Sequence, residues 1–156
     1  MSQYRIAWLP GDGVGVEVME AARICLDALH FDATYTHGDI GWEFWRTEGE
    51  AFPQRTIDLL KASDAALFGA ITSKPARDAE AELVPALKGT GLVYRSPIVR
   101  MRQLFDLYTC LRPCKAYPGN PLNYKQDIDL VIFRENTEGL YAGVESSPVP
   151  EELKAM

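Results

Sequence analysis

The order of short apolar segments and longer amphipathic ones constrains the fold of this chain most strongly. Segments 4–9, 32–36 and 65–68 are short, apolar or alternating, and predict β-strands. Segments 16–29 and 53–61, which lie between them, space their apolar residues as a helix does. Strand–helix–strand–helix–strand order is typical of a parallel sheet covered by helices. We therefore predict an α/β fold with an open, mainly parallel sheet that is flanked by helices.

The second half of the chain has a different character. The composition of residues 70–91 predicts a polar loop, after which Ser96 and the proline that follows it suit the start of a helix. Segments 107–112 and 129–133 predict two further strands. Segment 41–47 fits neither a helix nor a strand clearly, and its structure stays open.

This change of character suggests two domains. We place a boundary near residue 106, so that residues 1–106 form the N-terminal part of a large α/β domain. Residues 107–156 then form the start of a second, smaller α/β lobe. Because the final residues begin a new pattern without completing it, we expect an incomplete sheet and a truncated chain.

Composition narrows the class of partner. A hydrophobic fraction of 47% is typical of a globular protein, and a net charge of −6 argues against nucleic acid. No apolar run approaches the roughly 20 residues that span a bilayer, and no signal peptide precedes the first strand. We therefore expect a cytoplasmic protein without a membrane partner. Cys25, Cys110 and Cys114 do not suit a disulfide framework, and we predict buried free thiols.

Three arginines stand in unusual contexts. Arg112 and Arg134 interrupt apolar, strand-like runs, where an unpaired charge is costly to bury, and Arg102 lies shortly before them. A guanidinium group grips a carboxylate through two parallel hydrogen bonds. Basic residues also outnumber acidic ones between residues 95 and 115. We predict that the three arginines converge on a small anionic ligand in a cleft between the two lobes; in the alternative, each pairs with a nearby acid or lies at the surface.

The glycine-rich segment 11–15 lies between the first strand and the first helix. Backbone N–H groups at such a place can hold a phosphate. The dinucleotide-binding fingerprint, however, needs a small residue at position 16, where Val16 stands. Asp39 also lies beyond the end of the second strand rather than at it. A phosphate site and a tight structural turn therefore both stay open.

Taken together, four motifs resemble those of the β-decarboxylating dehydrogenases, the family of isocitrate, homoisocitrate, 3-isopropylmalate and tartrate dehydrogenases. These motifs occupy residues 9–15, 69–75, 106–113 and 134–141. The resemblance runs from Arg5 to about Val144, nearly the whole chain. Val16 replaces a proline of the family, and Thr109-Cys110 replaces the commoner Ala-Asn, but neither change removes an arginine.

The resemblance implies roles for individual residues. Arg102, Arg112 and Arg134 match the family's substrate-binding arginines. Tyr141 matches its catalytic tyrosine, and Thr72 a position that approaches the nicotinamide of the cofactor. The implied reaction transfers a hydride from a 2-hydroxy acid to NAD or NADP and then releases carbon dioxide with the help of Mg²⁺ or Mn²⁺. The metal ligands and the general-base lysine are expected outside this segment, so the segment alone should be inactive, and the full-length protein should form a homodimer or a larger homo-oligomer.

The identity of the substrate is predicted from Ser96. This residue shares roughly one face of the predicted helix with Val99 and Arg102. Its hydroxyl and the helix N-terminus favour a third carboxylate, whereas isopropylmalate enzymes resemble one another in placing leucines there. Together with the Arg-Glu-Asn-Thr-Glu-Gly string, this favours isocitrate or homoisocitrate. A 3-isopropylmalate or tartrate dehydrogenase, a non-catalytic regulatory subunit of the same fold, and a Ser96 that only caps its helix stay open as alternatives.

Overall fold

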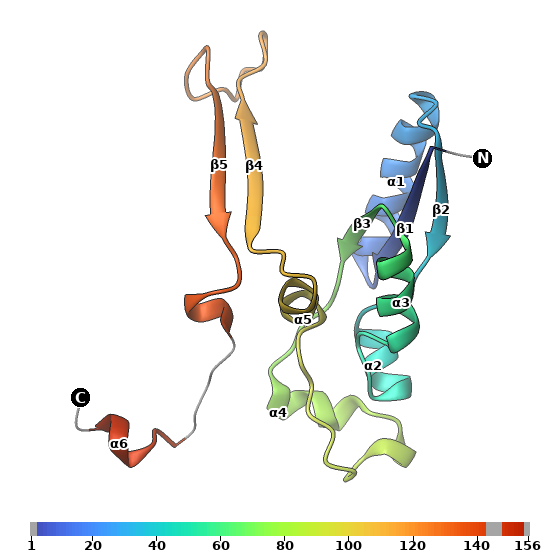
Figure 1. The fold of residues 1–156 in the computed structure, drawn as a ribbon, viewed down its shortest axis with the longest axis vertical. Helices are drawn as coiled ribbons and strands as arrows, with labels where there is room; N and C mark the ends of the chain where they lie inside the picture. The colour runs from blue at the N-terminus through green and yellow to red at the C-terminus, as the bar shows by residue number, and fades with distance from the viewer. Residues whose placement is uncertain (1–2, 143–147, 155–156) are drawn as a thin grey trace. The chain divides into compact units, whose positions relative to one another are not determined.

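The computed structural model describes residues 3–142 and 148–154. The chain divides into two compact units, residues 1–97 and 98–156, each drawn as a ribbon in Figure 1. We describe each unit by itself, and the predicted domain boundary near residue 106 stays a prediction. Among the described residues, none of the helices combines the length and the apolar character that crossing a lipid bilayer requires.

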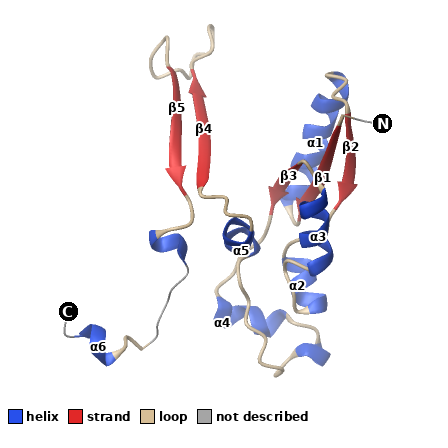
Figure 2. Ribbon diagram, in the orientation of Figure 1, coloured by secondary structure: helices blue, strands red, loops and turns tan. Residues whose placement is uncertain are grey.

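The first unit is built on a parallel sheet, as the sequence predicted. Its strands are β1 (Tyr4–Gly11), β2 (Ala33–His37) and β3 (Ala65–Ala70), and they lie in the order β2-β1-β3, drawn as arrows in Figure 2. The central strand β1 carries Ala7 and Leu9, which are fully buried. An apolar central strand can be buried on both faces because helices cover a parallel sheet.

Three helices accompany this sheet: α1 (Val14–Ala28), α2 (Trp42–Glu48) and α3 (Gln54–Ala62). The predicted helices at 16–29 and 53–61 are thus confirmed, and the ambiguous segment 41–47 forms a helix. Helix α1 contacts β1 and β3, and its buried residues are Gly15 and Met19. Cys25 on the same helix is exposed, so the predicted burial of this thiol is wrong. The spacing of apolar residues predicts a helix, but it does not determine which side of the helix packs against the sheet and which side, here with Cys25, faces solvent.

Close packing of α1 on the sheet explains the glycines at its start. A Cβ atom at Gly15 would lie 2.2 Å from the Pro10 carbonyl oxygen and 2.5 Å from that of Ala70. A Cβ atom at Gly69 would lie 2.4 Å from the same Pro10 oxygen. Both positions therefore need glycine so that the helix can approach the two strands, which favours the structural interpretation of the glycine-rich segment over a phosphate site.

The segment predicted as a polar loop at 70–91 is more ordered than its composition suggested. It contains helix α4 (Ala76–Ala79) and two 3₁₀ turns, η1 (Glu80–Glu82) and η2 (Pro85–Leu87). Its residues join an aromatic core that consists of Trp42, Trp45, Ala51, Ala79, Leu83 and Tyr94. The indole nitrogen of Trp45 donates a 2.8 Å hydrogen bond to the Ala79 carbonyl oxygen, because a buried indole N–H needs an acceptor.

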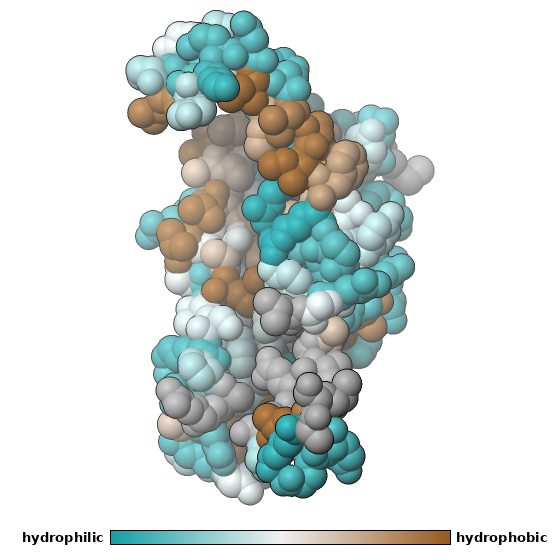
Figure 3. All heavy atoms as spheres, turned by 90° about the vertical axis from the view of Figure 1, so that its left-hand side faces the viewer, coloured by the Kyte–Doolittle hydropathy of each residue, from teal (hydrophilic) through white to brown (hydrophobic). Residues whose placement is uncertain are grey.

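The second unit contains an antiparallel pair of strands. Helix α5 (Pro97–Leu104) leads into β4 (Thr109–Lys115) and β5 (Asp129–Glu135), which are followed by the 3₁₀ turn η3 (Gly139–Ala142) and helix α6 (Glu151–Lys154). The two predicted strands are confirmed, and Thr109 pairs with Glu135 at one end of the ladder. Large apolar side chains of these strands stay exposed, Leu111 at 56% and Phe133 at 73%, and Figure 3 shows hydrophobic atoms at the surface.

Candidate functional site

Three elements of the second unit each carry one of the predicted arginines. Arg102 lies on α5, Arg112 on β4 and Arg134 on β5. Arg134 stands directly across the ladder from Cys110, and Arg112 is two residues further along β4. Directly opposed residues, and residues two apart on one strand, share a face of the hairpin. The backbone register thus places Arg112 and Arg134 on the same face.

Tyr141 joins two of these arginines. The guanidinium carbon of Arg134 lies 4.8 Å from the centroid of the Tyr141 ring, and that of Arg102 lies 5.8 Å from it. The amide nitrogen of Gln103 donates hydrogen bonds of 3.3 and 3.1 Å to the carbonyl oxygens of Tyr141 and Ala142. These bonds tie η3 to α5, so the ring is held in reach of both cations.

All three arginines lower the pKa of Cys110. The Nε of Arg112 donates a 3.2 Å hydrogen bond to the Cys110 sulfur. This bond is the main reason that the pKa of Cys110 lies below its usual value, and the positive charges of Arg134 and Arg102 lower it further. Any anion at this place is stabilised by three guanidinium groups. Cys110 is half-buried and Cys114 exposed, so the predicted burial of these thiols is wrong here as well, although both are free as predicted.

A carboxylate that sequence analysis missed shapes the turn between β5 and η3. Glu135 accepts hydrogen bonds from the Thr137 hydroxyl at 2.6 Å, the Thr137 backbone N–H at 2.5 Å and the Glu138 N–H at 2.9 Å. These bonds, the Thr137 hydroxyl first, lower the pKa of Glu135 to about 2. The turn brings Tyr141 back to Arg134. An acid followed two residues later by threonine is a signal that could have indicated this local capping.

No carboxylate in residues 3–142 and 148–154 forms an ion pair with Arg102, Arg112 or Arg134. The sequence alternative in which each pairs with a nearby acid therefore does not hold for the described part of the chain. Since an arginine cannot give up its charge in a protein, three such groups around one place suit an anionic ligand with more than one carboxylate. Arg102 and Arg134 lie beside Tyr141, and Arg112 bonds Cys110; that the three converge on a ligand in a cleft between the lobes stays a prediction.

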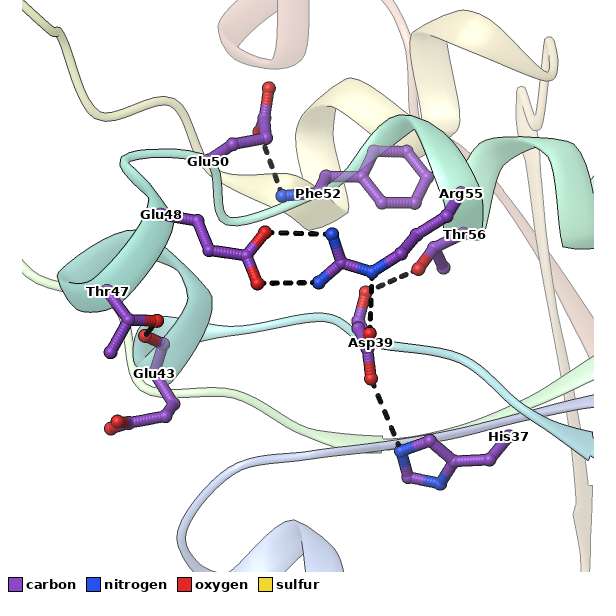
Figure 4. Close-up of polar contacts among 9 residues, drawn as sticks. All are labelled: His37, Asp39, Glu43, Thr47, Glu48, Glu50, Phe52, Arg55 and Thr56. Carbon is purple, nitrogen blue, oxygen red and sulfur yellow. Dashed lines mark hydrogen bonds and ion pairs between the residues drawn. The ribbon is translucent and has the colours of Figure 1, made fainter.

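Arg55 in the first unit shows the opposite arrangement (Figure 4). Its Nε donates to Asp39 at 2.6 Å, and its two terminal nitrogens donate to Glu48 at 2.8 Å each. The bonds to Glu48, followed by that to Asp39, raise the pKa of Arg55. His37 lies 3.6 Å from the other Asp39 oxygen. Both oxygens of Asp39 thus have partners within the first unit.

Thr72 belongs to the first unit and lies two residues after β3, where its side chain is exposed. Its backbone N–H and its hydroxyl both donate to one oxygen of Asp12, at 2.7 and 2.6 Å. The other oxygen of Asp12 accepts a 2.5 Å hydrogen bond from the Trp42 backbone N–H. Sequence analysis found Thr72 but missed Asp12, although the acid between two glycines at a strand end was a visible signal.

Ser96 also belongs to the first unit, where it is half-buried and directly precedes α5. This position agrees with an N-cap, and a contact of Ser96 with a third carboxylate stays a prediction. Among the described residues, histidine, cysteine, aspartate and glutamate form no group of three or more that could hold a metal ion. Carboxylate binding by the arginines of the second unit, and a contact of the exposed Thr72 hydroxyl with a cofactor, stay predictions.

Comparisons with known proteins give a consistent result. The family model described as isocitrate/isopropylmalate dehydrogenase matches residues 5–155. Protein DlpA of Legionella pneumophila is 44% identical over 97% of the chain, and 3-isopropylmalate dehydrogenase of Methanothermobacter thermautotrophicus is 41% identical over 93%. The crystal structure of isocitrate dehydrogenase from Methylococcus capsulatus matches 91% of the chain with 30% identity and a TM-score of 0.72. The chain spans only 24%, 38% and 37% of these three proteins, respectively.

Proposed function

Because this chain belongs to the isocitrate/isopropylmalate dehydrogenase family, we propose that it forms the N-terminal part of an NAD(P)-dependent oxidative decarboxylase of a 2-hydroxy acid. The observation that carries this proposal is the meeting of Arg102, Arg134 and Tyr141 around one place. Arg112 faces the same place through Cys110. Since no carboxylate of the described residues pairs with these arginines, a polycarboxylate ligand would supply the negative charges opposite them.

Each of these residues has a task in the proposed reaction. The arginines bind the carboxylates of the substrate and hold the leaving carboxylate in the orientation that its loss requires. The Tyr141 phenol gives a proton to the carbon that carbon dioxide has left. Arg134 and Arg102 lie against its ring and stabilise the negative charge that develops on the phenol oxygen.

Two further groups complete the proposed chemistry. A nicotinamide cofactor, NAD or NADP, would accept the hydride, and Mg²⁺ or Mn²⁺ would polarise the hydroxyl and ketone oxygen. Thr72 is the residue of this chain that we assign to the nicotinamide, because its exposed hydroxyl lies at the carboxyl end of β3, where α/β sheets bind ligands. The metal ligands and the general base are proposed to lie outside this segment, so the segment alone should not turn over substrate.

For the substrate we propose isocitrate or homoisocitrate. Ser96 directly precedes α5 and offers a hydroxyl beside a helix N-terminus, both of which favour a third carboxylate over an alkyl group. Relatives named for isopropylmalate and for isocitrate are both similar to this chain, so identity alone does not choose between them. The hydroxyl at position 96 is the feature that supports a tricarboxylate in this proposal.

The experiment is a substrate panel on the full-length protein. Isocitrate, homoisocitrate, 3-isopropylmalate and tartrate are each assayed with NAD and with NADP, in Mg²⁺ and in Mn²⁺, while reduced cofactor and carbon dioxide are both measured. We expect equal amounts of the two products and the highest kcat/KM for a tricarboxylate. Binding of a tricarboxylate without any turnover would instead identify a regulatory subunit of the same fold.

The proposed assembly is tested separately. Members of this family are expected to act as homodimers or larger homo-oligomers, and we propose the same for the full-length protein. Light scattering after size-exclusion chromatography measures its mass directly. A strictly monomeric protein with full activity would contradict this part of the proposal.

A further inference from the structure

Asp12 connects three segments of the first unit at one edge of the sheet. It directly follows β1, Thr72 lies shortly after β3, and Trp42 opens α2. The backbone N–H of Asp12 donates a 2.9 Å hydrogen bond to the Ala70 carbonyl oxygen, so its own position is fixed by the strand beside it. Because β1 and β3 are parallel, their carboxyl ends bring Asp12 and Thr72 together although 60 residues separate them.

The direction of the hydrogen bonds follows from chemistry. Both oxygens of Asp12 face backbone N–H groups, Thr72 at 2.7 Å and Trp42 at 2.5 Å, and these groups can only donate. An ionised carboxylate is an acceptor only, so the Thr72 hydroxyl must be the donor in its 2.6 Å bond to Asp12. A hydroxyl carries one hydrogen. The Thr72 oxygen therefore offers two lone pairs and no hydrogen to anything outside the protein.

The surroundings hold the Asp12 side chain in this rotamer. Gly41 precedes α2 with a φ of +118°, and a Cβ atom there would lie 2.4 Å from one Asp12 oxygen. Glycine at this position lets the start of α2 approach the carboxylate closely. With three hydrogen bonds from two different loops, the carboxylate cannot turn away from Thr72 without breaking at least one of them.

We propose that Asp12 is a positioning residue that makes Thr72 a hydrogen-bond acceptor for the carboxamide NH₂ of the nicotinamide cofactor. This inference rests on the proposed function, since it takes the cofactor from there. Asp12 touches no ligand; it acts by taking the only hydroxyl hydrogen of Thr72. The consequence is selectivity for a ligand that carries an N–H donor at this place over one of equal shape that lacks it.

The test compares two cofactors that differ in this donor alone. The dissociation constants of NADH or NADPH and of the corresponding reduced 3-acetylpyridine analogue are measured on the full-length protein by fluorescence titration, without substrate. The analogue replaces the carboxamide NH₂ by a methyl group. We expect the natural cofactor to bind about three- to tenfold more tightly, the value of one neutral hydrogen bond. Thr72→Val should abolish this preference, and Thr72→Ser should keep it.

The Asp12 variants decide the positioning role. Asp12→Ala should lower the preference to that of Thr72→Val, because the free hydroxyl can then turn its hydrogen outward. Asp12→Asn should lower the preference only in part, because in either orientation its NH₂ group opposes a backbone N–H, that of Trp42 or that of Thr72. If Asp12→Ala does not fold, the unmodified protein still decides, because equal binding of the two cofactors by it would overturn the proposal.

Two other results would overturn the inference in distinguishable ways. If Asp12→Ala weakens both cofactors equally and leaves their ratio unchanged, Asp12 only supports the fold, and the proposed function stands. If the unmodified protein binds neither cofactor, the proposed function fails and this inference fails with it. A thermal unfolding curve of each variant separates loss of stability from loss of preference.

Discussion

Arg55 on α3 is held by two carboxylates of its own unit, whereas Arg102, Arg112 and Arg134 in the second unit face no described carboxylate. Other arginines of the first unit are also paired with carboxylates, in the ion pairs Arg5–Asp64, Arg23–Asp27 and Arg46–Glu43. A structural arginine has its counter-charge in the chain that it stabilises. An arginine that binds a ligand leaves this place to the ligand, and we predict that the three arginines of the second unit are of this kind.

The two units also differ in how their strands are covered. Ala7 and Leu9 on β1 have no exposed surface, while Leu111 on β4 and Phe133 on β5 are more than half exposed. An isolated pair of strands is marginally stable in water at best. The unit that holds the proposed substrate-binding residues therefore depends on further structure more than the unit that holds the parallel sheet.

The largest expected effect tests this second contrast. When the 156-residue polypeptide is expressed by itself, we expect it to aggregate or to protect β1 and β3 from amide hydrogen exchange far more than β4 and β5. The difference should reach several orders of magnitude, because the hairpin can open without exposing a buried core. Exchange measured by mass spectrometry on the soluble fraction checks this. A monomer that unfolds cooperatively, with equal protection of both units, would contradict it.

The next prediction tests the contrast between the arginines. Arg134→Gln in the full-length protein should lower kcat/KM by roughly two to three orders of magnitude, because a bidentate charge pair with the substrate is lost. The matched control is Arg55→Gln, which removes an arginine whose partners are Glu48 and Asp39 and should change kcat/KM little. Steady-state kinetics of both variants measure the two losses of kcat/KM. Comparable losses would contradict the distinction between ligand-binding and structural arginines.

Substrate choice is addressed by Ser96→Leu. If Ser96 receives a third carboxylate, the change should cost roughly 2–4 kcal/mol on isocitrate and homoisocitrate, which is about thirtyfold to nearly a thousandfold in kcat/KM. Activity on 3-isopropylmalate should fall much less, since the three arginines still hold the remaining carboxylates. Equal losses on all three substrates would show that Ser96 only caps α5.

A smaller effect concerns the thiol among the arginines. The hydrogen bond from Arg112, with the charges of Arg134 and Arg102, lowers the pKa of Cys110, so its alkylation by iodoacetamide should persist to lower pH than usual for a cysteine. Arg112→Gln should move the midpoint of this profile upward, while Arg55→Gln should leave it in place. Peptide mass spectrometry reads Cys110 separately from the other cysteines. An unchanged midpoint in Arg112→Gln would mean that Arg112 does not act on the thiol.

The smallest effect comes from a paired arginine at the surface of the first unit. Arg5 bonds Asp64 through its guanidinium at 2.7 Å and lowers the pKa of Asp64 from 3.8 to about 2. A carboxylate whose pKa is depressed by folding stabilises the protein above its unfolded pKa and stops doing so as the pH falls toward the folded one. Asp64→Asn should therefore flatten the decline of stability between these two pH values. Urea unfolding of the full-length protein at several pH values measures it, and an unchanged slope would argue against the pair.

Local sequence patterns predicted much of this structure. The period of the apolar residues specified three strands and two helices of the first unit, and strand–helix alternation specified that its sheet is parallel. The contexts of Arg112 and Arg134 led to the prediction that they bind an anion, because an unpaired charge in an apolar strand is costly to bury. Such signals are contained in short stretches of chain, so they can be recognised without coordinates.

Long-range contacts required the tertiary structure. The bond between Asp12 and Thr72 exists because two parallel strands end side by side, and no local pattern shows where each loop turns after its strand. The packing of Ala79 against Trp45, in a segment with the composition of a polar loop, is a second example. Cys110 is a third: its neighbours Arg112 and Arg134 come from two strands whose register decides which side chains share a face. Sequence determined which groups were present, and the pairing of distant segments decided which of them meet, since hydrogen bonds and charges act only over the few ångströms that folding sets.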